Sequence, residues 1–314
     1  MKTQIFATAT LLAAFSGTLP AADPRLLNLV MPDATVLAGV NVDQAKATPF
    51  GQYVLTTLIQ SQAQQLQQLA TQTGFDPRQD VHELLLASTS ASGNKTGLAL
   101  ALGAFDLGKI AAAAQAAGAG AETYGGFSII EDPQHQNGFA FLDSTLVVAG
   151  DLANVKAAID RSRAGGQTIS ISIALAAQVN QLSSAEDAWA ISTVPPSTLR
   201  PAAAVPPAAG VNVQNALQKI ESASAGVKFG SVVVVTGQAQ AATPQDATSV
   251  GDVLKLFVSM AQLQASQHPE AAALAQSLVV SAQGSTVKIT LSLPEDQIQQ
   301  LVKPKAAARK VVRM

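Results

Sequence analysis

Apolar and polar residues alternate over several short stretches of the chain, and between these stretches apolar residues recur at helical spacing. In "TVKITLSL" (286–293), four aliphatic residues alternate with threonine, lysine and serine. This is the period-2 pattern of a strand whose sheet has one solvated face. In residues 48–74, Leu55, Ile59 and Leu66 lie on one helical stripe. The chain therefore combines antiparallel strands with long amphipathic helices.

These patterns predict an α+β fold in which antiparallel sheets are backed by long helices. Strands are expected at 34–43, 80–89, 96–106, 122–132, 137–143, 144–151, 187–194, 227–240, 278–283 and 286–293. Helices are expected at 48–74, 107–117, 152–166, 173–184, 212–226, 250–267 and 269–278, and a last one begins at Pro294.

The order strand, helix, strand, strand, helix recurs along the chain. It describes residues 99–160 and 227–302, and residues 34–117 give a third version of it. Little residue identity accompanies the recurrence beyond a Ser-Thr pair. We predict an internal duplication of this unit, the alternative being that α+β chains alternate in this way by chance.

A proline-rich stretch interrupts these elements at 195–210, where five of the 15 prolines lie. Such a segment resists helix and central strand and stays extended as a spacer. The predicted organisation is a signal peptide over 1–22, an α+β domain with repeated units over 23–194, a Pro/Ala-rich linker over 195–210, a second α+β unit over 211–302 and a basic tail over 303–314.

The first 22 residues have the order of an export signal. Lys2 is the only charge before Asp23, an apolar run follows it, and small residues allow cleavage near Ala21 or Ala22. An uncleaved membrane anchor is the alternative. The chain has no cysteine, which excludes disulfides, thiolate metal sites and a lipidated cysteine. A periplasmic or secreted bacterial protein, without a transmembrane anchor after cleavage, is expected.

Charge is distributed unevenly. The formal net charge is −2, yet residues 303–314 hold five basic residues and no acid. This tail predicts weak contact with an anionic surface, the alternative being a solubilising segment. The remainder is acidic and poor in aromatic residues, so no specific nucleic-acid binding is expected. Trp189, in an apolar strand, is expected in the core.

Residues with catalytic or metal-binding chemistry do not form a recognisable constellation. His82, His135 and His268 lack partners at metal-ligand spacing. "EDPQH" (131–135) is a conceivable acid/base cluster, but its proline marks an ordinary solvated loop. "GAGAETYGG" (118–126) follows a helix, whereas a dinucleotide loop follows a strand. The sequence thus predicts no catalytic, cofactor or metal residues and no cofactor.

Four segments resemble exported bacterial proteins of unknown function that are built from repeated α+β units. They are "LLNLVMPDATVLAGVNVDQAKATPFGQYVL" (26–55), "TGFDPRQDVHELLLAS" (73–88), "YGGFSII" (124–130) and "GFAFLDSTLVVAGDLANVKAAI" (138–159). The resemblance implies a repeated α+β architecture and transfers no functional residue.

The expected function is a non-catalytic exported binding or scaffold protein that contacts an unknown protein or envelope component. Two alternatives stay open. A carrier of a hydrophobic ligand would place an apolar cavity between helices and sheet. A hydrolytic enzyme would need carboxylates or histidines that converge only in the folded chain.

Overall fold

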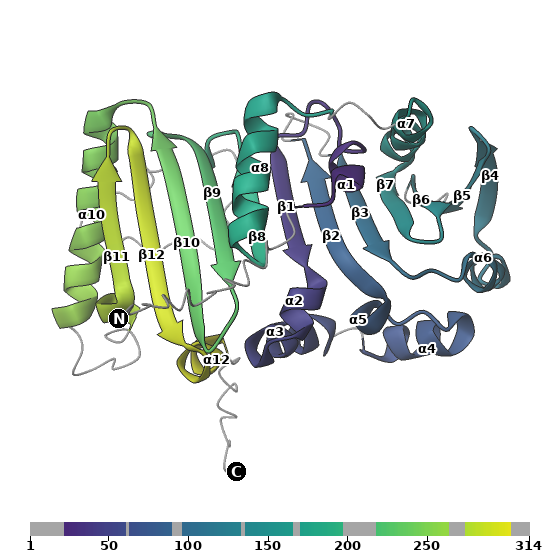
Figure 1. The fold of residues 1–314 in the computed structure, drawn as a ribbon, viewed down its shortest axis with the longest axis horizontal. Helices are drawn as coiled ribbons and strands as arrows, with labels where there is room; N and C mark the ends of the chain where they lie inside the picture. The colour runs from purple at the N-terminus through teal and green to yellow at the C-terminus, as the bar shows by residue number, and fades with distance from the viewer. Residues whose placement is uncertain are drawn as a thin grey trace, which may run out of the picture.

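One antiparallel sheet runs through the whole molecule (Figure 1). This computed structural model describes residues 22–60, 63–89, 96–132, 136–165, 170–196, 218–263 and 274–302. Its twelve strands lie in the order β11-β12-β10-β9-β8-β1-β2-β3-β7-β6-β5-β4. The predicted α+β class with an antiparallel sheet is confirmed.

The strands are β1 (Val36–Asn41), β2 (Val81–Ser88), β3 (Gly97–Gly103), β4 (Gly120–Tyr124), β5 (Phe127–Asp132), β6 (Asn137–Asp143), β7 (Leu146–Asp151), β8 (Ala188–Ser192), β9 (Ile220–Lys228), β10 (Val232–Ala241), β11 (Leu278–Gln283) and β12 (Thr286–Pro294). The helices are α1 (Pro24–Leu27), α2 (Val42–Lys46), α3 (Pro49–Gln60), α4 (Ala63–Thr73), α5 (Pro77–Asp80), α6 (Leu107–Ala116), α7 (Leu152–Arg163), α8 (Ile173–Ala185), α10 (Pro244–Leu263) and α12 (Glu295–Val302).

The region after the proline-rich stretch differs from its prediction. Residues 220–226, expected at the end of a helix, belong to β9, and the expected strand at 227–240 is divided between β9 and β10. Alanine, serine and glycine dominate this segment and give no clear period. Pairing with β8 on one side and β10 on the other decides its conformation.

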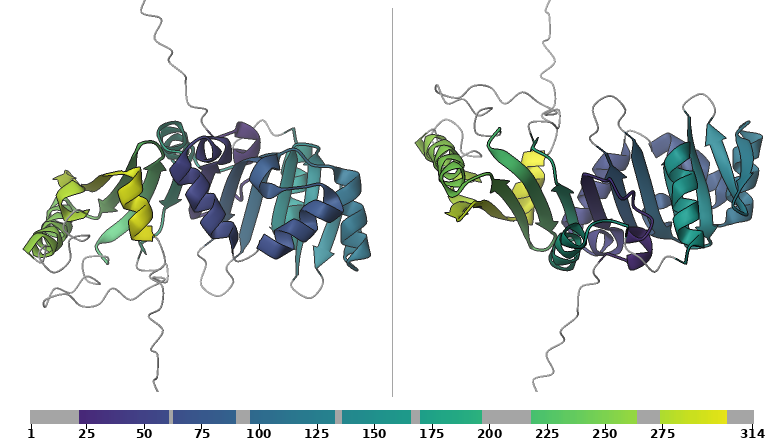
Figure 2. Two further views of the ribbon diagram at one scale, coloured as in Figure 1. Left: turned by 90° about the horizontal axis from the view of Figure 1, so that it is seen from below. Right: turned by 90° about the horizontal axis from the view of Figure 1, so that it is seen from above.

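The two faces of the sheet are named after the helices that cover them. The α8 face carries Leu85 and Ala87 of β2, and the α10 face carries Leu84 and Leu86 of the same strand. Figure 2 shows the sheet with helices on both of its sides. Paired residues on neighbouring strands lie on the same face of the sheet, so the strand register assigns the residues of all twelve strands to one face or the other.

In the N-terminal half, the largest buried cluster lies on the α8 face. Helices α1, α7 and α8 cover it, and Leu85, Leu100 and Val148 are fully buried there. The chain just before β1 joins this cluster through Leu26, Val30 and its neighbours. Burying such side chains stabilises the fold by about 2 kcal/mol each.

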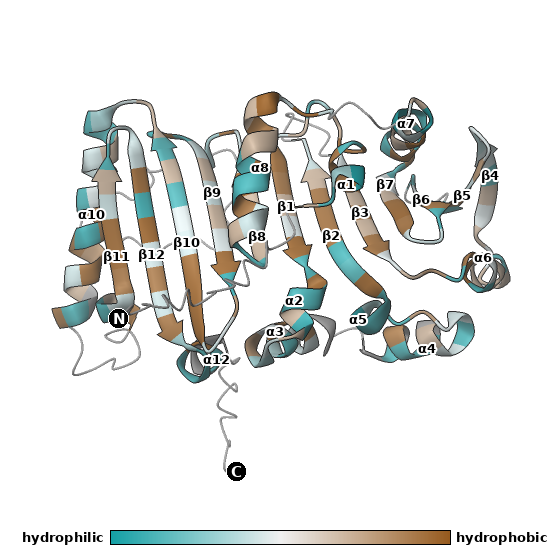
Figure 3. Cartoon of the chain, in the orientation of Figure 1, coloured by the Kyte–Doolittle hydropathy of each residue, from teal (hydrophilic) through white to brown (hydrophobic). Residues whose placement is uncertain are grey.

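In the C-terminal half, the buried cluster changes to the α10 face. Val233 of β10 and Leu293 of β12 pack with Phe50 of α3 and Ile298 of α12, while Val250 of α10 packs in a neighbouring cluster. The α8 face is polar here. Its outward residues include Thr236, Gln238, Gln240, Thr286, Lys288 and Thr290. Figure 3 shows the resulting alternation along β12.

The core changes faces at β8, where three residues lie side by side. Trp189 pairs with Gly39 of β1 on one side and with Gly226 of β9 on the other. A Cβ on Gly39 would lie 2.5 Å from the indole ring. Trp189 is 6% exposed, which confirms its predicted core position. The indole thus occupies space that Gly39 leaves open, while a Cβ on Gly226 would meet the side chain of Glu186.

Asp187, just before β8, ties the halves together. Its carboxylate accepts hydrogen bonds from Lys228 Nζ and from the backbone N–H of Phe229, both at 2.6 Å. Its carbonyl accepts a bond from the N–H of Asn41 at 2.8 Å. Since Asp187 is only 3% exposed, this is a buried joint between β1, β8 and β9.

Several predictions fall on parts of the chain that lie outside the described residues. These parts are most of the linker, residues 269–273 of the helix expected at 269–278, the basic tail and nearly all of the signal peptide. The sheet itself continues from β8 to β9 across the linker. The internal duplication stays a prediction. No helix in the described ranges has the length and apolarity needed to cross a membrane.

Candidate ligand-binding face

An apolar row crosses the α10 face at right angles to the strands. Strand register places six residues next to one another on β7, β3, β2, β1, β8 and β9: Ala149, Ala99, Leu86, Ala38, Ala190 and Ala225. The row continues through Gly237 of β10 to Ile289 of β12. Because strands lie about 4.8 Å apart, the first six members span roughly 24 Å.

Helices cover only parts of this face. Next to the row, toward α4 and α6, Ala101 and Leu84 pack with Phe105 and Ile110. At the other end, α10 packs on β10, β12 and β11. In the middle, Leu86 is 45% exposed, and Ala190 and Ala225 are exposed. Among the described residues, no element covers this central strip.

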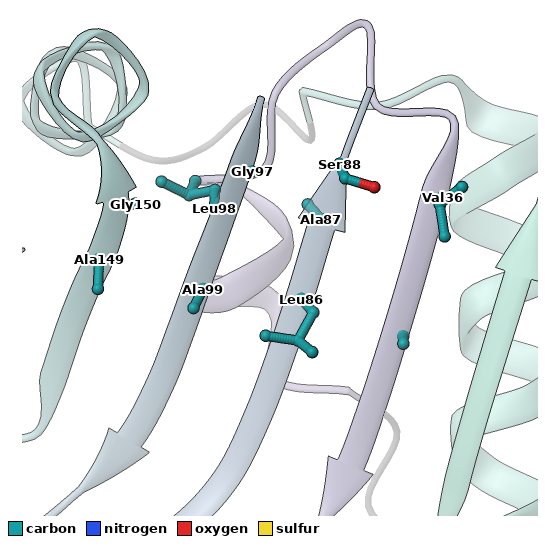
Figure 4. A pocket seen from close by; sticks show the side chains of 10 residues that line it. Val36, Leu86, Ala87, Ser88, Gly97, Leu98, Ala99, Ala149 and Gly150 are labelled. Carbon is teal, nitrogen blue, oxygen red and sulfur yellow. The ribbon is translucent and has the colours of Figure 1, made fainter. Parts of the chain in front are cut away.

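A hollow of about 510 Å³ lies over this uncovered part. Val36, Ala38, Leu86, Ala99 and Ala149 provide its side-chain lining, with Ser88 at one end. Figure 4 shows Ala149, Ala99 and Leu86 on neighbouring strands at its base. Small-molecule sites have this size range and are lined mostly by apolar side chains with few polar groups.

A second apolar hollow, of about 270 Å³, lies between α10 and the sheet. Val253, Leu254 and Phe257 of α10 face Gly237 and Ile289 across it. Gly237 belongs to the same row as Ala38 of the first hollow. Within this row, Ala190 and Ala225 lie between the two hollows.

One hydroxyl residue lines the first hollow, at the end of strand β2. Ser88 lies in its lining, and the next residue, Thr89, forms a hydroxyl pair with Thr96 at 3.1 Å. On β8, the Ser192 hydroxyl donates to the Val194 carbonyl at 2.8 Å. The lining of the first hollow is thus aliphatic, with Ser88 as its uncharged polar side chain.

The residues considered for chemistry in the sequence do not meet in this site. His82 lies exposed on β2 with Nδ1 2.9 Å from Asp43 Oδ2. His135 and His268 lie outside the described residues, as does the basic tail. Within the described ranges, no group of three His, Asp or Glu could hold a metal ion. The stretch 118–126 follows α6 and contains β4 and the turn after it.

One cluster of titratable groups gathers where β4 and β5 meet α7. Lys156 Nζ lies 2.7 Å from Glu122, and the Tyr124 hydroxyl donates to Asp160 at 2.9 Å. Glu131 of β5 lies beside Glu122, and the hydrogen bond between their carboxyl groups raises the pKa of Glu131. The hydrogen bond with Lys156 lowers the pKa of Glu122. None of these groups lines either apolar hollow, so the cluster attaches a helix to the sheet edge.

These features define the class of the protein by its fold: an open antiparallel α+β sheet with one face partly covered and apolar. Neither a protein-family model nor a curated protein matches the chain. Two solved structures of the Treponema protein TP0453 are similar in fold, crystal forms III and IV, with TM-scores of 0.55 and 0.52. Each is 8% identical and covers 88% of this chain and 96% of its own. At that identity, the likeness shows the fold alone.

Sequence patterns missed the hollows for a physical reason. Ala99, Ala38 and Ala190 come from strands far apart along the chain, and alanine alone carries no signal of exposure. A partial signal existed in "HELLLAS" (82–88), where three consecutive leucines break the alternation. An unbroken apolar run indicates a strand that is apolar on both faces.

Proposed function

We propose that this chain is a non-catalytic exported protein that binds an aliphatic ligand on the central strip of the α10 face. The uncovered apolar hollow over β1, β2, β3 and β7 is the observation that carries the proposal. Its side-chain lining is aliphatic apart from Ser88, so the recognised part of the ligand is a hydrocarbon chain. The Ser88 hydroxyl can donate a hydrogen bond to a polar head group.

Burial of hydrocarbon would supply the affinity. Each methylene removed from water contributes about 0.8 kcal/mol before the cost of ordering the chain is subtracted. A ligand of this kind also explains why an apolar strip could stay exposed, since water contact there is unfavourable without an occupant. Export is supported by the order of residues 1–22 and by the absence of cysteine.

The test uses displacement of a fluorescent fatty acid, 11-(dansylamino)undecanoate, by oleate. The purified chain should bind the probe and release it when oleate is added. Ala99→Trp places an indole in the hollow and should weaken binding at least tenfold, which corresponds to 1.4 kcal/mol. Ala153→Trp, at an exposed position of α7, is the matched control and should bind normally.

Two results would overturn the proposal. One is a folded wild-type protein that takes up neither the probe nor oleate. The other is equal binding by Ala99→Trp and Ala153→Trp when both variants retain wild-type circular dichroism, because a hydrocarbon in the hollow cannot share its volume with an indole.

A further inference from the structure

Asp23, just before α1, makes a contact that has no role in the ligand site. The backbone N–H of Asp23 lies 3.1 Å and 3.4 Å from the two carboxylate oxygens of Glu83 on β2. One amide proton thus faces both oxygens of a carboxylate. The neighbouring residue, Ala22, is 5% exposed and donates its own N–H to the Ser183 hydroxyl of α8 at 2.9 Å.

Glu83 is a partly buried acid that lacks a basic partner. It lies on the α8 face, paired in the sheet with Asn41 of β1 and Leu102 of β3. Across the described ranges, no lysine, arginine or histidine lies within ion-pair distance of its carboxylate. Arg25 is bound instead to Asp23 at 3.0 Å. Burial raises the pKa of Glu83 against the opposing effect of the Asp23 N–H, as expected for a desolvated acid.

We propose that removal of the leader cleaves the Ala22–Asp23 bond and that the new α-ammonium of Asp23 pairs with Glu83. The step is hydrolysis by a leader peptidase. Water adds across the peptide bond, the leader departs with the new carboxylate at Ala22, and the released amine takes up a proton. The neutral N–H at 3.1 Å then becomes a cation facing both oxygens, which makes a charge-assisted hydrogen bond.

The same geometry discriminates between the two cleavage positions that the sequence leaves open. Cleavage after Ala21 would place the ammonium on Ala22, whose nitrogen is bonded to the hydroxyl of Ser183. A buried ammonium beside a neutral acceptor is unfavourable. Cleavage after Ala22 places the ammonium on Asp23, whose nitrogen faces the carboxylate of Glu83. Ser183 then keeps its bond to the Asn180 carbonyl at 3.4 Å.

The order of events follows from burial. Because Ala22 is buried in the folded chain, the bond after it is open to a peptidase only before folding. Folding after cleavage would then insert the new terminus between β2 and α8. The pair would be a contact that exists only in the processed protein.

The first experiment determines the mature terminus. The full chain is exported from a bacterial host, and its intact mass and N-terminal sequence are measured. Asp23 as the first residue is expected. A first residue of Ala22, or any other, overturns the cleavage position and with it the proposed pair.

The second experiment measures Glu83→Gln in two chains. One begins at Asp23, released from a removable fusion, and the other retains residues 18–22 ahead of it. In the first chain, the substitution should lower Tm by about 2–4 °C at pH 6.5, the shift expected for a contact of about 1 kcal/mol. In the second chain, Tm should not fall. Glu221→Gln, at an exposed position of β9, should affect both chains equally.

The pH dependence has a defined sign. An α-amine titrates near 7.7–8.0 when unfolded, and pairing with Glu83 raises that pKa in the folded chain. The extra stability is therefore complete below the unfolded value and lost as pH rises through the folded value. Asp23 and Arg25 are the other charged groups that act on Glu83, and both are present in the two chains. Equal Tm shifts in the two chains would overturn the pair.

This inference rests on the proposed export but not on the ligand. A processed protein that begins at Asp23 and binds no oleate would refute the carrier alone. A protein that binds oleate but begins elsewhere would refute the ammonium pair alone.

Discussion

The two halves of the sheet bury opposite faces. Strands β1 to β7 place their main core on the α8 face, under α1, α7 and α8, whereas β10 and β12 place theirs on the α10 face. The N-terminal half is apolar on both faces and the C-terminal half on one. A continuous sheet can therefore change the side of its core without breaking its hydrogen bonds.

The change of sides leaves the central strip uncovered. Helices α1, α7 and α8 lie across the α8 face, whereas on the α10 face α6 packs at one end and α10 reaches only the far strands (Figures 1 and 2). Between them, Leu86, Ala190 and Ala225 of the apolar row are exposed. The proposed ligand site is thus a consequence of how the two halves are joined.

The largest effect is expected from neighbouring leucines on opposite faces of β2. Leu85 is 0% exposed and Leu86 is 45% exposed. Leu85→Ala should lower the free energy of unfolding by about 3 kcal/mol, because it leaves a cavity in the main core. Leu86→Ala should cost less than about 1 kcal/mol. Urea unfolding followed by circular dichroism measures both, and equal losses would contradict the assignment of faces.

A smaller loss is expected at the joint between the halves. Asp187→Asn removes the charge that Lys228 contacts and places an amide NH₂ in a site built for an acceptor. Removing one partner of a buried pair is costly, but Lys228 is 33% exposed and water can rehydrate it. A loss of about 2 kcal/mol is expected. Fluorescence of Trp189 during unfolding reports this joint directly, and an unchanged midpoint would show that the pair does not hold the halves together.

The packing of Trp189 gives the next prediction. Gly39→Ala places a Cβ 2.5 Å from the indole ring, so the ring must shift. Such overpacking should cost about 1–2 kcal/mol and change the emission of Trp189. Gly97→Ala is the control, since its Cβ would meet only a backbone oxygen at 3.8 Å. Identical emission spectra for wild type and Gly39→Ala would contradict the close approach.

The smallest effect is expected on the polar side of the C-terminal half. Gln238→Ala changes an exposed residue on the α8 face of β10, and the free energy of unfolding should change by no more than about 0.5 kcal/mol. Val233→Ala, on the opposite face of the same strand and 0% exposed, should cost clearly more. A reversed order, measured by urea unfolding, would place the core of this half on the other side.

Periodicity predicted most elements because their patterns are local. The alternation at 286–293 became β12, and the helix predicted at 173–184 became α8. It failed at 220–226, where alanine and serine suit several conformations and the neighbouring strands decide. It also could not assign a face to Leu84, Leu85 and Leu86, since consecutive leucines show no alternation.

By itself, the sequence determined the α+β class, the positions of most strands and helices, and the absence of thiol chemistry. These depend on residue type and on spacing within one segment. Only the tertiary structure decided that Leu85 is buried while Leu86 is exposed, that alanines from distant strands form one row, and that Glu83 meets Asp23. These facts depend on strand register and on the side from which each helix packs. Contacts between residues remote along the chain fix both.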